Sequence, residues 1–173
     1  LKLADQLHAA IVRSPHAHAD IRGIDARAAL QMPGVHVVLT GKDYEADGLG
    51  TMSSMAPYKK RDGSAMYLPH RPAIAIGRAM HVGYPVAVVV ADTLDQARDA
   101  AERVEVDYAP RPAILNAEDA FKPGAPQLYP DCPNNEAYFY QAGNKAAVDE
   151  AFARAAHVVE QRAERIPEAA NIS

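Results

Sequence analysis

The arrangement of apolar and polar residues predicts short strands alternating with short helices in the first part of the chain. Residues 7–13 form an apolar run of strand length that ends at a Ser-Pro step, and residues 19–24 alternate as a second strand. Asp25 is the predicted N-cap of a short helix that runs to Leu30 and is terminated by Pro33-Gly34. A compact apolar strand is expected over residues 35–40.

The strongest apolar run, Val86 to Ala91, predicts a central strand that is buried on both faces of a sheet. Thr93 and Gln96 follow with the spacing of a capping box, which predicts a helix over residues 94–103. Its apolar positions recur at three- and four-residue steps, so one side of this helix should face the sheet. Residues 104–108 then alternate as a half-exposed strand.

Two regions interrupt this pattern. Between Gly41 and Pro72 glycine and proline break every candidate element, and we expect a long excursion or flap that either has a function of its own or lies against a partner. After residue 109 prolines predict mostly extended chain, with a short helix over 117–121 capped by Asn116.

A last helix is predicted from Asn144 to about Ala156, followed by a strand over residues 157–165. The expected buried stripe of this helix consists of Val148, Phe152 and Ala155. Taken together, the elements predict the α+β class with a mixed β-sheet and short packed helices.

Composition adds few constraints. The chain has 173 residues and a formal net charge of -4, so it lacks the clustered basic face that is typical of nucleic-acid binding. The single short basic cluster, Lys59-Lys60-Arg61, is interpreted as a solvated loop. No apolar run approaches the roughly 20 residues that cross a bilayer, and no signal peptide is evident. We expect a cytoplasmic chain that is part of a longer protein.

Candidate chemistry is sparse. His16 and His18 could share one face of a strand and bind a metal if a third ligand came from elsewhere, but a polar turn after an apolar strand is the favoured interpretation. Cys132 follows an acid, which disfavours the thiolate, and Glu118 with Asp119 fits the start of a helix. Gly48-Leu49-Gly50 lacks the context of a phosphate loop. The residues therefore predict a fold without an active site.

Three stretches together resemble the start of the large subunit of molybdenum hydroxylases, the xanthine dehydrogenase and aldehyde oxidase family. They are Leu-His-Ala-Ala-Ile-Val-Arg-Ser-Pro-His-Ala-His-Ala over residues 7–19, Met-Pro-Gly-Val with Leu-Thr-Gly-Lys-Asp over 32–35 and 39–43, and Val-Gly-Tyr-Pro-Val-Ala over 82–87. The third continues through residues 91–98 to Val-Glu-Val-Asp-Tyr at 104–108. Their order and spacing also match the family, and together they cover most of residues 3–120.

The resemblance implies an α/β hammerhead domain over residues 1–142. It further implies that residues 143–173 are a linker helix and first strand leading toward molybdopterin-binding domains outside this chain. The domain would be the non-catalytic N-terminal part of a large subunit whose parent protein hydroxylates an aldehyde or N-heterocycle, or oxidises carbon monoxide, with water as the oxygen source.

The resemblance also implies the cofactors and partners. The parent protein would carry a molybdenum-molybdopterin cofactor, with iron-sulfur clusters and FAD on partner subunits or domains. The domain would pack against the rest of the large subunit and against the iron-sulfur and flavin subunits. No catalytic, cofactor-binding or metal-binding residue of the family falls within this chain.

The expected contacts with other domains or subunits involve a turn at the end of the first strand and one residue before the central strand. The candidate interface residues are Arg13, Ser14, Pro15, His16, His18 and Tyr84, together with the excursion from Gly48 to Arg71. Tyr84 departs from the family, which has a polar residue at this position. Two rival hypotheses stay open: a stand-alone binding or scaffold domain without redox chemistry, and a small hydrolase with a spatially assembled triad.

Overall fold

Two three-stranded sheets make up the regular part of the chain. The computed structural model describes residues 3–52 and 57–161, and the chain divides into one unit of residues 1–139 and a second of residues 140–173. The strands are β1 His8–Arg13, β2 Ala19–Asp25, β3 Val35–Thr40, β4 Arg78–Ala79, β5 Pro85–Ala91 and β6 Glu105–Pro110. The helices are α1 Arg27–Leu30, α2 Gly41–Ala46, α3 Leu94–Ala101, the 3-10 helices η1 Ala117–Phe121 and η2 Pro133–Asn135, and α4 Lys145–Arg154.

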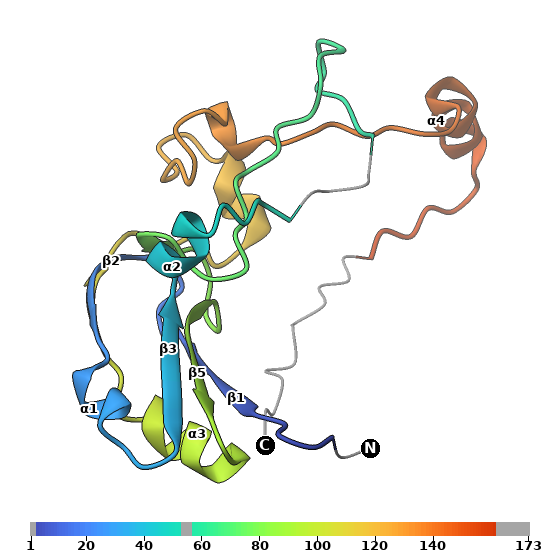
Figure 1. Cartoon of the computed structure of the whole chain (residues 1–173). Helices are drawn as coiled ribbons and strands as arrows, with labels where there is room; N and C mark the ends of the chain where they lie inside the picture. The colour runs from blue at the N-terminus through green and yellow to red at the C-terminus, as the bar shows by residue number, and fades with distance from the viewer. Residues whose placement is uncertain (1–2, 53–56, 162–173) are drawn as a thin grey trace. The chain divides into compact units, whose positions relative to one another are not determined.

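The first sheet has the order β1-β5-β3, so the strongest apolar run is its central strand, as predicted (Figure 1). Helix α3 packs against β1 and β5, and α1 packs against β3 and α3. The core between these helices and the sheet is small and built from Ala29, Val38, Ala87, Val89, Ala100 and Val104. Because half of these residues are alanine, the helices lie close to the strands and small changes in side-chain volume are felt there.

The second sheet has the order β4-β2-β6. Ala19 pairs with Ala79 on one side and with Pro110 on the other, and it is fully buried. The pairing of β2 with β6 shifts register between Ile21 and Gly23, which marks a β-bulge. This sheet brings together three segments of the first unit that are far apart in sequence, around residues 19–25, 78–79 and 105–110.

Helix α3 begins with the predicted capping box. The Thr93 hydroxyl accepts a hydrogen bond from the Gln96 N–H at 3.2 Å, and the Gln96 side-chain carbonyl accepts one from the Thr93 N–H at 3.0 Å. Ala97 and Ala100 are the buried residues of the helix. The helix that sequence periodicity predicts after the central strand is therefore confirmed, although it ends at Ala101 rather than Arg103.

One local expectation was wrong. The excursion does not begin at Gly41, because α2 forms there with the Asp43 carboxylate accepting hydrogen bonds from the N–H and hydroxyl of Thr40, both at 2.7 Å. Residues 73–77 contain bends and no strand, and β4 is limited to Arg78–Ala79. Gly77 has a φ of +67°, a left-handed conformation that interrupts an extended chain.

The second unit contains α4, which begins at the predicted Asn144: its side-chain carbonyl accepts a hydrogen bond from the Ala147 N–H at 3.0 Å. The stripe expected to be buried is exposed at Val148, Phe152 and Ala155, because no other helix or strand of this unit lies within its described residues. Of the strand expected over 157–165, residues 157–161 have no regular structure and the rest lie outside the described residues.

The α+β class with short helices is confirmed. The strands form two small sheets rather than one, and every pairing between the named strands is antiparallel. A parallel pairing would need a longer crossover of a dozen or more residues, usually a helix, between its two strands. Among the described residues, no helix is long and apolar enough to cross a membrane.

Candidate functional site

The turn after β1 is fastened to the loop before β5, which is distant in sequence. The Ser14 N–H donates to the Tyr84 carbonyl at 2.9 Å, and the Gly83 N–H donates to the Ser14 carbonyl at 2.8 Å. Arg13 Nη1 also donates to the Gly83 carbonyl at 2.8 Å. The two predicted interface segments therefore form one structural element, which no local sequence signal indicates.

Two of the predicted interface residues lie inside the chain. Ser14 is 2% exposed, and its hydroxyl accepts from the His16 N–H at 3.1 Å and donates to the His16 carbonyl at 3.2 Å. His18 is 6% exposed, and its Nδ1 lies 2.8 Å from the Pro112 carbonyl, so Nδ1 carries a proton. Both side chains hold the turn in shape, and any partner would contact their neighbours instead.

The remaining predicted residues have accessible surface. Arg13 and Pro15 are exposed, whereas His16 and Tyr84 are half-buried. The His16 ring packs edge-on against the ring of Tyr108, with centroids 4.8 Å apart. The structure thus divides the predicted set into an interior pair, Ser14 and His18, and an accessible rim.

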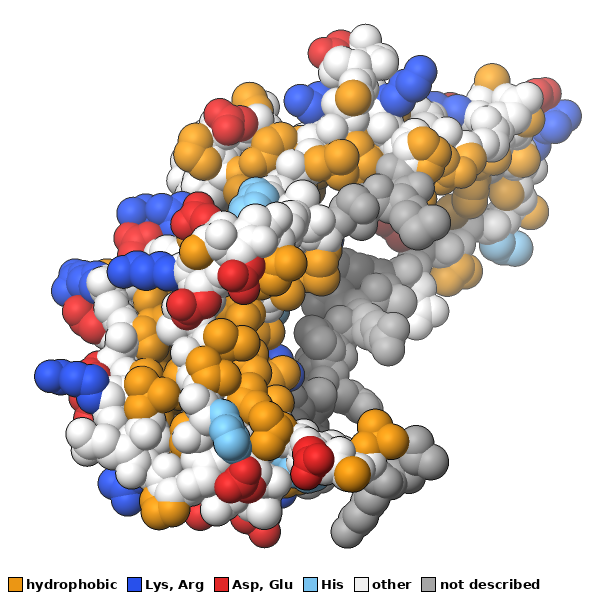
Figure 2. Space-filling view, in the orientation of Figure 1, with side chains coloured by type: hydrophobic (Ala, Val, Ile, Leu, Met, Phe, Trp, Pro, Cys, Tyr) orange, Lys and Arg blue, Asp and Glu red, His pale blue; other side chains and the backbone are white. Residues whose placement is uncertain are grey.

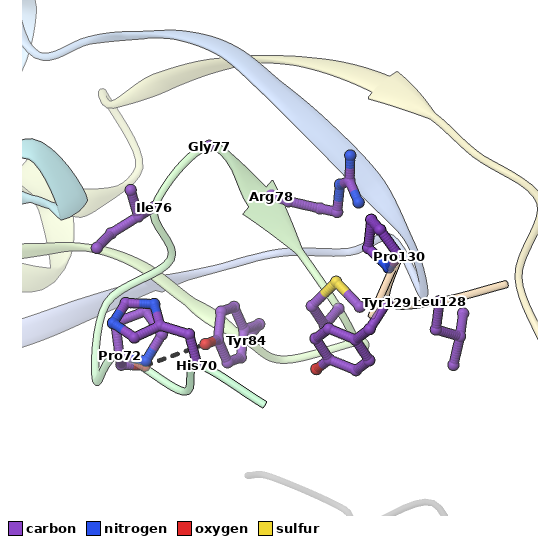
Figure 3. Close-up of a pocket in the computed structure, with 10 residues that line it drawn as sticks. His70, Pro72, Ile76, Gly77, Arg78, Tyr84, Leu128, Tyr129 and Pro130 are labelled. Carbon is purple, nitrogen blue, oxygen red and sulfur yellow. Dashed lines mark hydrogen bonds between the residues drawn. The ribbon is translucent and has the colours of Figure 1, made fainter. Parts of the chain in front are cut away.

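Tyr84 lines a pocket of about 370 Å³ between the end of the excursion, β4 and the segment around residue 129 (Figure 3). The Tyr84 hydroxyl donates to the Pro72 carbonyl at 3.0 Å. Burial raises the pKa values of Tyr84 and Tyr129 above their ordinary range. The phenols therefore stay protonated at neutral pH, and the pocket walls are largely aromatic and apolar. Besides the two phenols, His70 and Arg78 are the ionisable side chains among the residues that line it.

Beside this pocket, Asp20 of β2 binds two arginines. Arg78 Nε donates to Asp20 Oδ1 at 2.9 Å, and Arg111 Nε donates to Asp20 Oδ2 at 2.5 Å. Hydrogen bonds from Arg111 and then Arg78 hold the pKa of the Asp20 carboxyl below its usual value. The partners lie 58 and 91 positions away along the chain, so the sequence carries no sign of this cluster.

We expect Asp20→Asn to remove a pH-dependent part of the stability. Because the pKa of Asp20 is lower in the folded than in the unfolded chain, its ion pairs stabilise the fold above the unfolded pKa, and that contribution is lost as the pH falls through the folded pKa. Urea denaturation of both proteins from neutral to strongly acid pH measures the difference in unfolding free energy. The difference should be constant near neutrality and shrink in acid.

Comparing the unfolding free energies of the unaltered chain and of Asp20→Asn separates the contribution of Asp20 from that of the other acidic residues. Asp25, whose pKa Arg27 lowers to about 2, and Asp43, whose pKa hydrogen bonds from Thr40 lower, titrate equally in both proteins. A difference that does not change with pH would show that the two arginines do not stabilise the carboxylate.

The far part of the excursion pairs with the end of the first unit. Lys59 is bridged to Ala65 and to Phe139, and the Phe139 N–H donates to the Lys59 carbonyl at 2.9 Å. The Arg61 guanidinium lies 3.9 Å from the centre of the Phe139 ring and forms an ion pair with Glu136 at 3.0 Å. The basic cluster predicted as a solvated loop is thus partly engaged within the chain through Arg61.

Within the described part of the chain, the other chemical candidates do not assemble into a site. Cys132 is buried, and burial raises the pKa of its thiol. The hydroxyl of Ser64 donates to Asp62 at 2.7 Å, and Ser14 bonds to backbone, whereas Ser53 and Ser54 lie outside the described residues. No group of three or more His, Cys, Asp or Glu side chains converges as metal ligands within residues 3–52 and 57–161.

Known proteins are similar to this chain in sequence and in fold. Residues 1–112 match the family described as aldehyde oxidase and xanthine dehydrogenase, a/b hammerhead domain. The carbon monoxide dehydrogenase large chain of Hydrogenophaga pseudoflava is 35% identical over 93% of this chain and 20% of its own length. The aldehyde oxidoreductase of Megalodesulfovibrio gigas is 38% identical over 80% of this chain and 14% of its own length. The chain therefore spans a fifth or less of these relatives.

Solved structures of related enzymes contain a similar fold. The reconstituted carbon monoxide dehydrogenase from Oligotropha carboxidovorans superposes with a TM-score of 0.73 at 32% identity, covering 91% of this chain and 20% of the other. The aldehyde oxidoreductase from Desulfovibrio gigas gives a TM-score of 0.65 at 37% identity, covering 80% of this chain and 14% of the other. The hammerhead fold expected from the sequence resemblance is confirmed.

Proposed function

The chain belongs to the aldehyde oxidase and xanthine dehydrogenase family through its hammerhead domain, and from this premise we propose that it is the non-catalytic N-terminal domain of a molybdenum hydroxylase large subunit. The observation that carries the proposal is the family match over residues 1–112. In this proposal residues 1–142 form the hammerhead domain, and residues 143–173 lead toward the molybdopterin-binding domains of the same polypeptide.

The residues of this chain do not fit the anionic pterin cofactor that the family implies. Phosphate groups of such cofactors bind at free helix N-termini, but capping side chains occupy three of the described ones: Asp43 at α2, Thr93 with Gln96 at α3, and Asn144 at α4. At α2 the cap is a carboxylate, which repels phosphate. The cofactor site of the parent protein is accordingly assigned to the part of the polypeptide outside this chain.

The role proposed for this domain is structural, within an assembly. The accessible rim of the fastened turn, namely Arg13, Pro15, His16 and Tyr84, would contact neighbouring domains or subunits. Ser14 and His18 would hold that rim in shape from inside, and the excursion from Gly48 to Arg71 would supply further contacts. The hydrogen bonds between the turn and the 83–84 loop support this role, because they present the rim as one preformed surface.

The parent protein is proposed to be a cytoplasmic oxidoreductase that hydroxylates an aldehyde or N-heterocycle, or oxidises carbon monoxide, with oxygen taken from water. Its partners would be iron-sulfur and flavin subunits or domains that remove the electrons. Two relatives support a multi-subunit arrangement, because one is a carbon monoxide dehydrogenase large chain and the other is a subunit of the 6-hydroxypseudooxynicotine dehydrogenase complex of Paenarthrobacter nicotinovorans.

Molybdenum content tests the proposal. Elemental analysis would be done on this chain and on the full-length protein, both produced with a competent cofactor supply. Metal bound to the full-length protein but not to this chain is the expected result. No metal in either preparation would overturn the enzyme assignment and favour a stand-alone binding or scaffold domain.

A further inference from the structure

Within residues 3–52 and 57–139, no helix packs on the second apolar face of the first sheet, although Val86 at the start of β5 is fully buried on that side. In the register of the sheet, Ile11 of β1, Val88 of β5 and Leu39 of β3 form one row across the three strands. Ala9, Val90 and Val37 form the next row. Directly paired residues point to the same side of a sheet, so these six side chains share the face opposite to the helices. We refer to them as the outer face.

The outer face is exposed along the two edge strands β1 and β3, whereas Val88 and Val90 of the central strand are half-buried. Ile11 is 45% exposed and Leu39 is 37% exposed, whereas Val89 on the opposite side of the central strand is fully buried. Figure 2 shows hydrophobic side chains gathered over β3 and β5. Polar groups lie only at the margins, with Arg13 at the end of β1 and His36, which pairs with Asp92 at 2.7 Å, at the start of β3.

This pattern is unusual for a sheet face that meets water. A solvated face of an antiparallel sheet normally alternates polar residues with the apolar ones that point into the core. Here all six outer positions are apolar, and the continuous run Val86 to Ala91 has the composition of a strand that is buried on both sides. A contiguous apolar patch of this kind marks a contact surface.

We propose that a helix from the remaining part of the same polypeptide covers the outer face. This inference rests on the proposed function, in which the chain is one domain of a longer large subunit. The chain spans 20% of the carbon monoxide dehydrogenase large chain of Hydrogenophaga pseudoflava. Three strands about 4.8 Å apart present a width close to the roughly 10 Å diameter of a helix, as they already do on the side of α3.

The small size of the outer face favours a covalently attached element, rather than a separate chain, as the part that covers it. Each side of a stable interface between separate proteins contributes about 20–30 residues, whereas the outer face offers six. A segment of the same polypeptide does not lose the freedom of an independent molecule when it docks, so a small apolar patch is sufficient to hold it. A separate subunit or a second copy would need a larger surface.

Photo-leucine incorporated into the full-length protein, prepared with its partner subunits, tests the proposal. Hydroxyl-radical footprinting of the unlabelled protein accompanies it and reports which leucines meet water. Leu30 of α1 is the internal control, because it is 48% exposed and lies outside the outer face. Leu39 and Leu30 differ only from 37% to 48% in exposure within this chain. We expect Leu39 to be oxidised several-fold more slowly than Leu30, well beyond that difference, and to cross-link to peptides of the same polypeptide beyond residue 173.

Every other result overturns the inference. Oxidation of Leu39 as fast as that of Leu30 would show that nothing covers the face. Cross-links from Leu39 to a partner subunit, or to a second copy of this polypeptide distinguished by isotope labelling, would assign a different occupant. Molybdenum analysis of the same preparation separates the two proposals: metal with an uncovered face refutes only the helix, and absent metal refutes the proposed enzyme.

Discussion

Gly41→Ala is expected to lower the free energy of unfolding by about 3 kcal/mol, because an added methyl group has no space at this position. A Cβ at Gly41 would lie 2.0 Å from the carbonyl oxygen of Ala75 and 2.7 Å from its carbonyl carbon. Both atoms are backbone, so relief requires a shift of the chain between the excursion and β5. Urea denaturation followed by far-UV circular dichroism measures the effect.

Gly23→Ala is the matched control for this substitution. An added Cβ at Gly23 meets nothing within 4 Å, and its backbone is not in the left-handed region. The control should leave stability unchanged or raise it slightly, since alanine reduces the freedom of the unfolded chain. Equal losses in the two variants would contradict the close approach of Gly41 to Ala75 and point to a general cost of replacing glycine.

Val89→Ala is expected to cost about 2.5 kcal/mol. Val89 is fully buried in the small core between the first sheet and α3. The substitution removes two methyl groups from water-free surroundings and leaves a cavity that the neighbouring alanines, which have no flexible side chains, cannot fill. The unfolding free energy in urea again measures the change, and the dependence on urea concentration should stay that of the unaltered chain.

Val88→Ala measures the stability cost of the same truncation on the other face of β5. Val88 lies on the outer face and is half-buried, so its truncation in this chain should cost about 1 kcal/mol or less. If the two substitutions were equally costly in the isolated chain, the assignment of one covered and one open face would be wrong. In the full-length protein the cost at Val88 should rise, because a covered face buries the methyl groups that are lost.

The two faces of the first sheet differ: helices pack on one side, whereas the outer face on the other side is largely open. One face supplies the stability of the domain through a small core of valine and alanine. The other face and the rim of the fastened turn have residues available for contact with neighbouring domains. This division of surfaces supports the structural role proposed for the domain.

Local signals in the sequence determined most of the elements. The apolar run of β5, the alternation of β6 and the capping box of Thr93 each depend on residues a few positions apart, so they can be recognised without knowledge of the fold. Helix α2 carried such a signal as well, in the spacing of Thr40 and Asp43, but the glycines and prolines that follow concealed it.

Family resemblance extended what the residues alone predict. It predicted the hammerhead fold from motifs between residues 7 and 108, and the family match over residues 1–112 confirms that fold. It also predicted that the turn at Ser14 and the side chain of Tyr84 contact other domains or subunits. The resemblance did not reveal that these two segments are bonded to each other, because the bonds join backbone groups whose approach depends on the register of β1 with β5.

Only the tertiary structure decided which residues are inside and which partners they have. The burial of Ser14 and His18, the binding of Asp20 by Arg78 and Arg111, and the contact of Gly41 with Ala75 all join positions that only folding brings together. Sequence patterns report preferences between near neighbours, whereas these contacts depend on how two sheets and a helix pack. For the same reason the apolar run Val86 to Ala91 predicted a strand buried on both faces, and only the arrangement of α1 and α3 showed which face this chain covers itself.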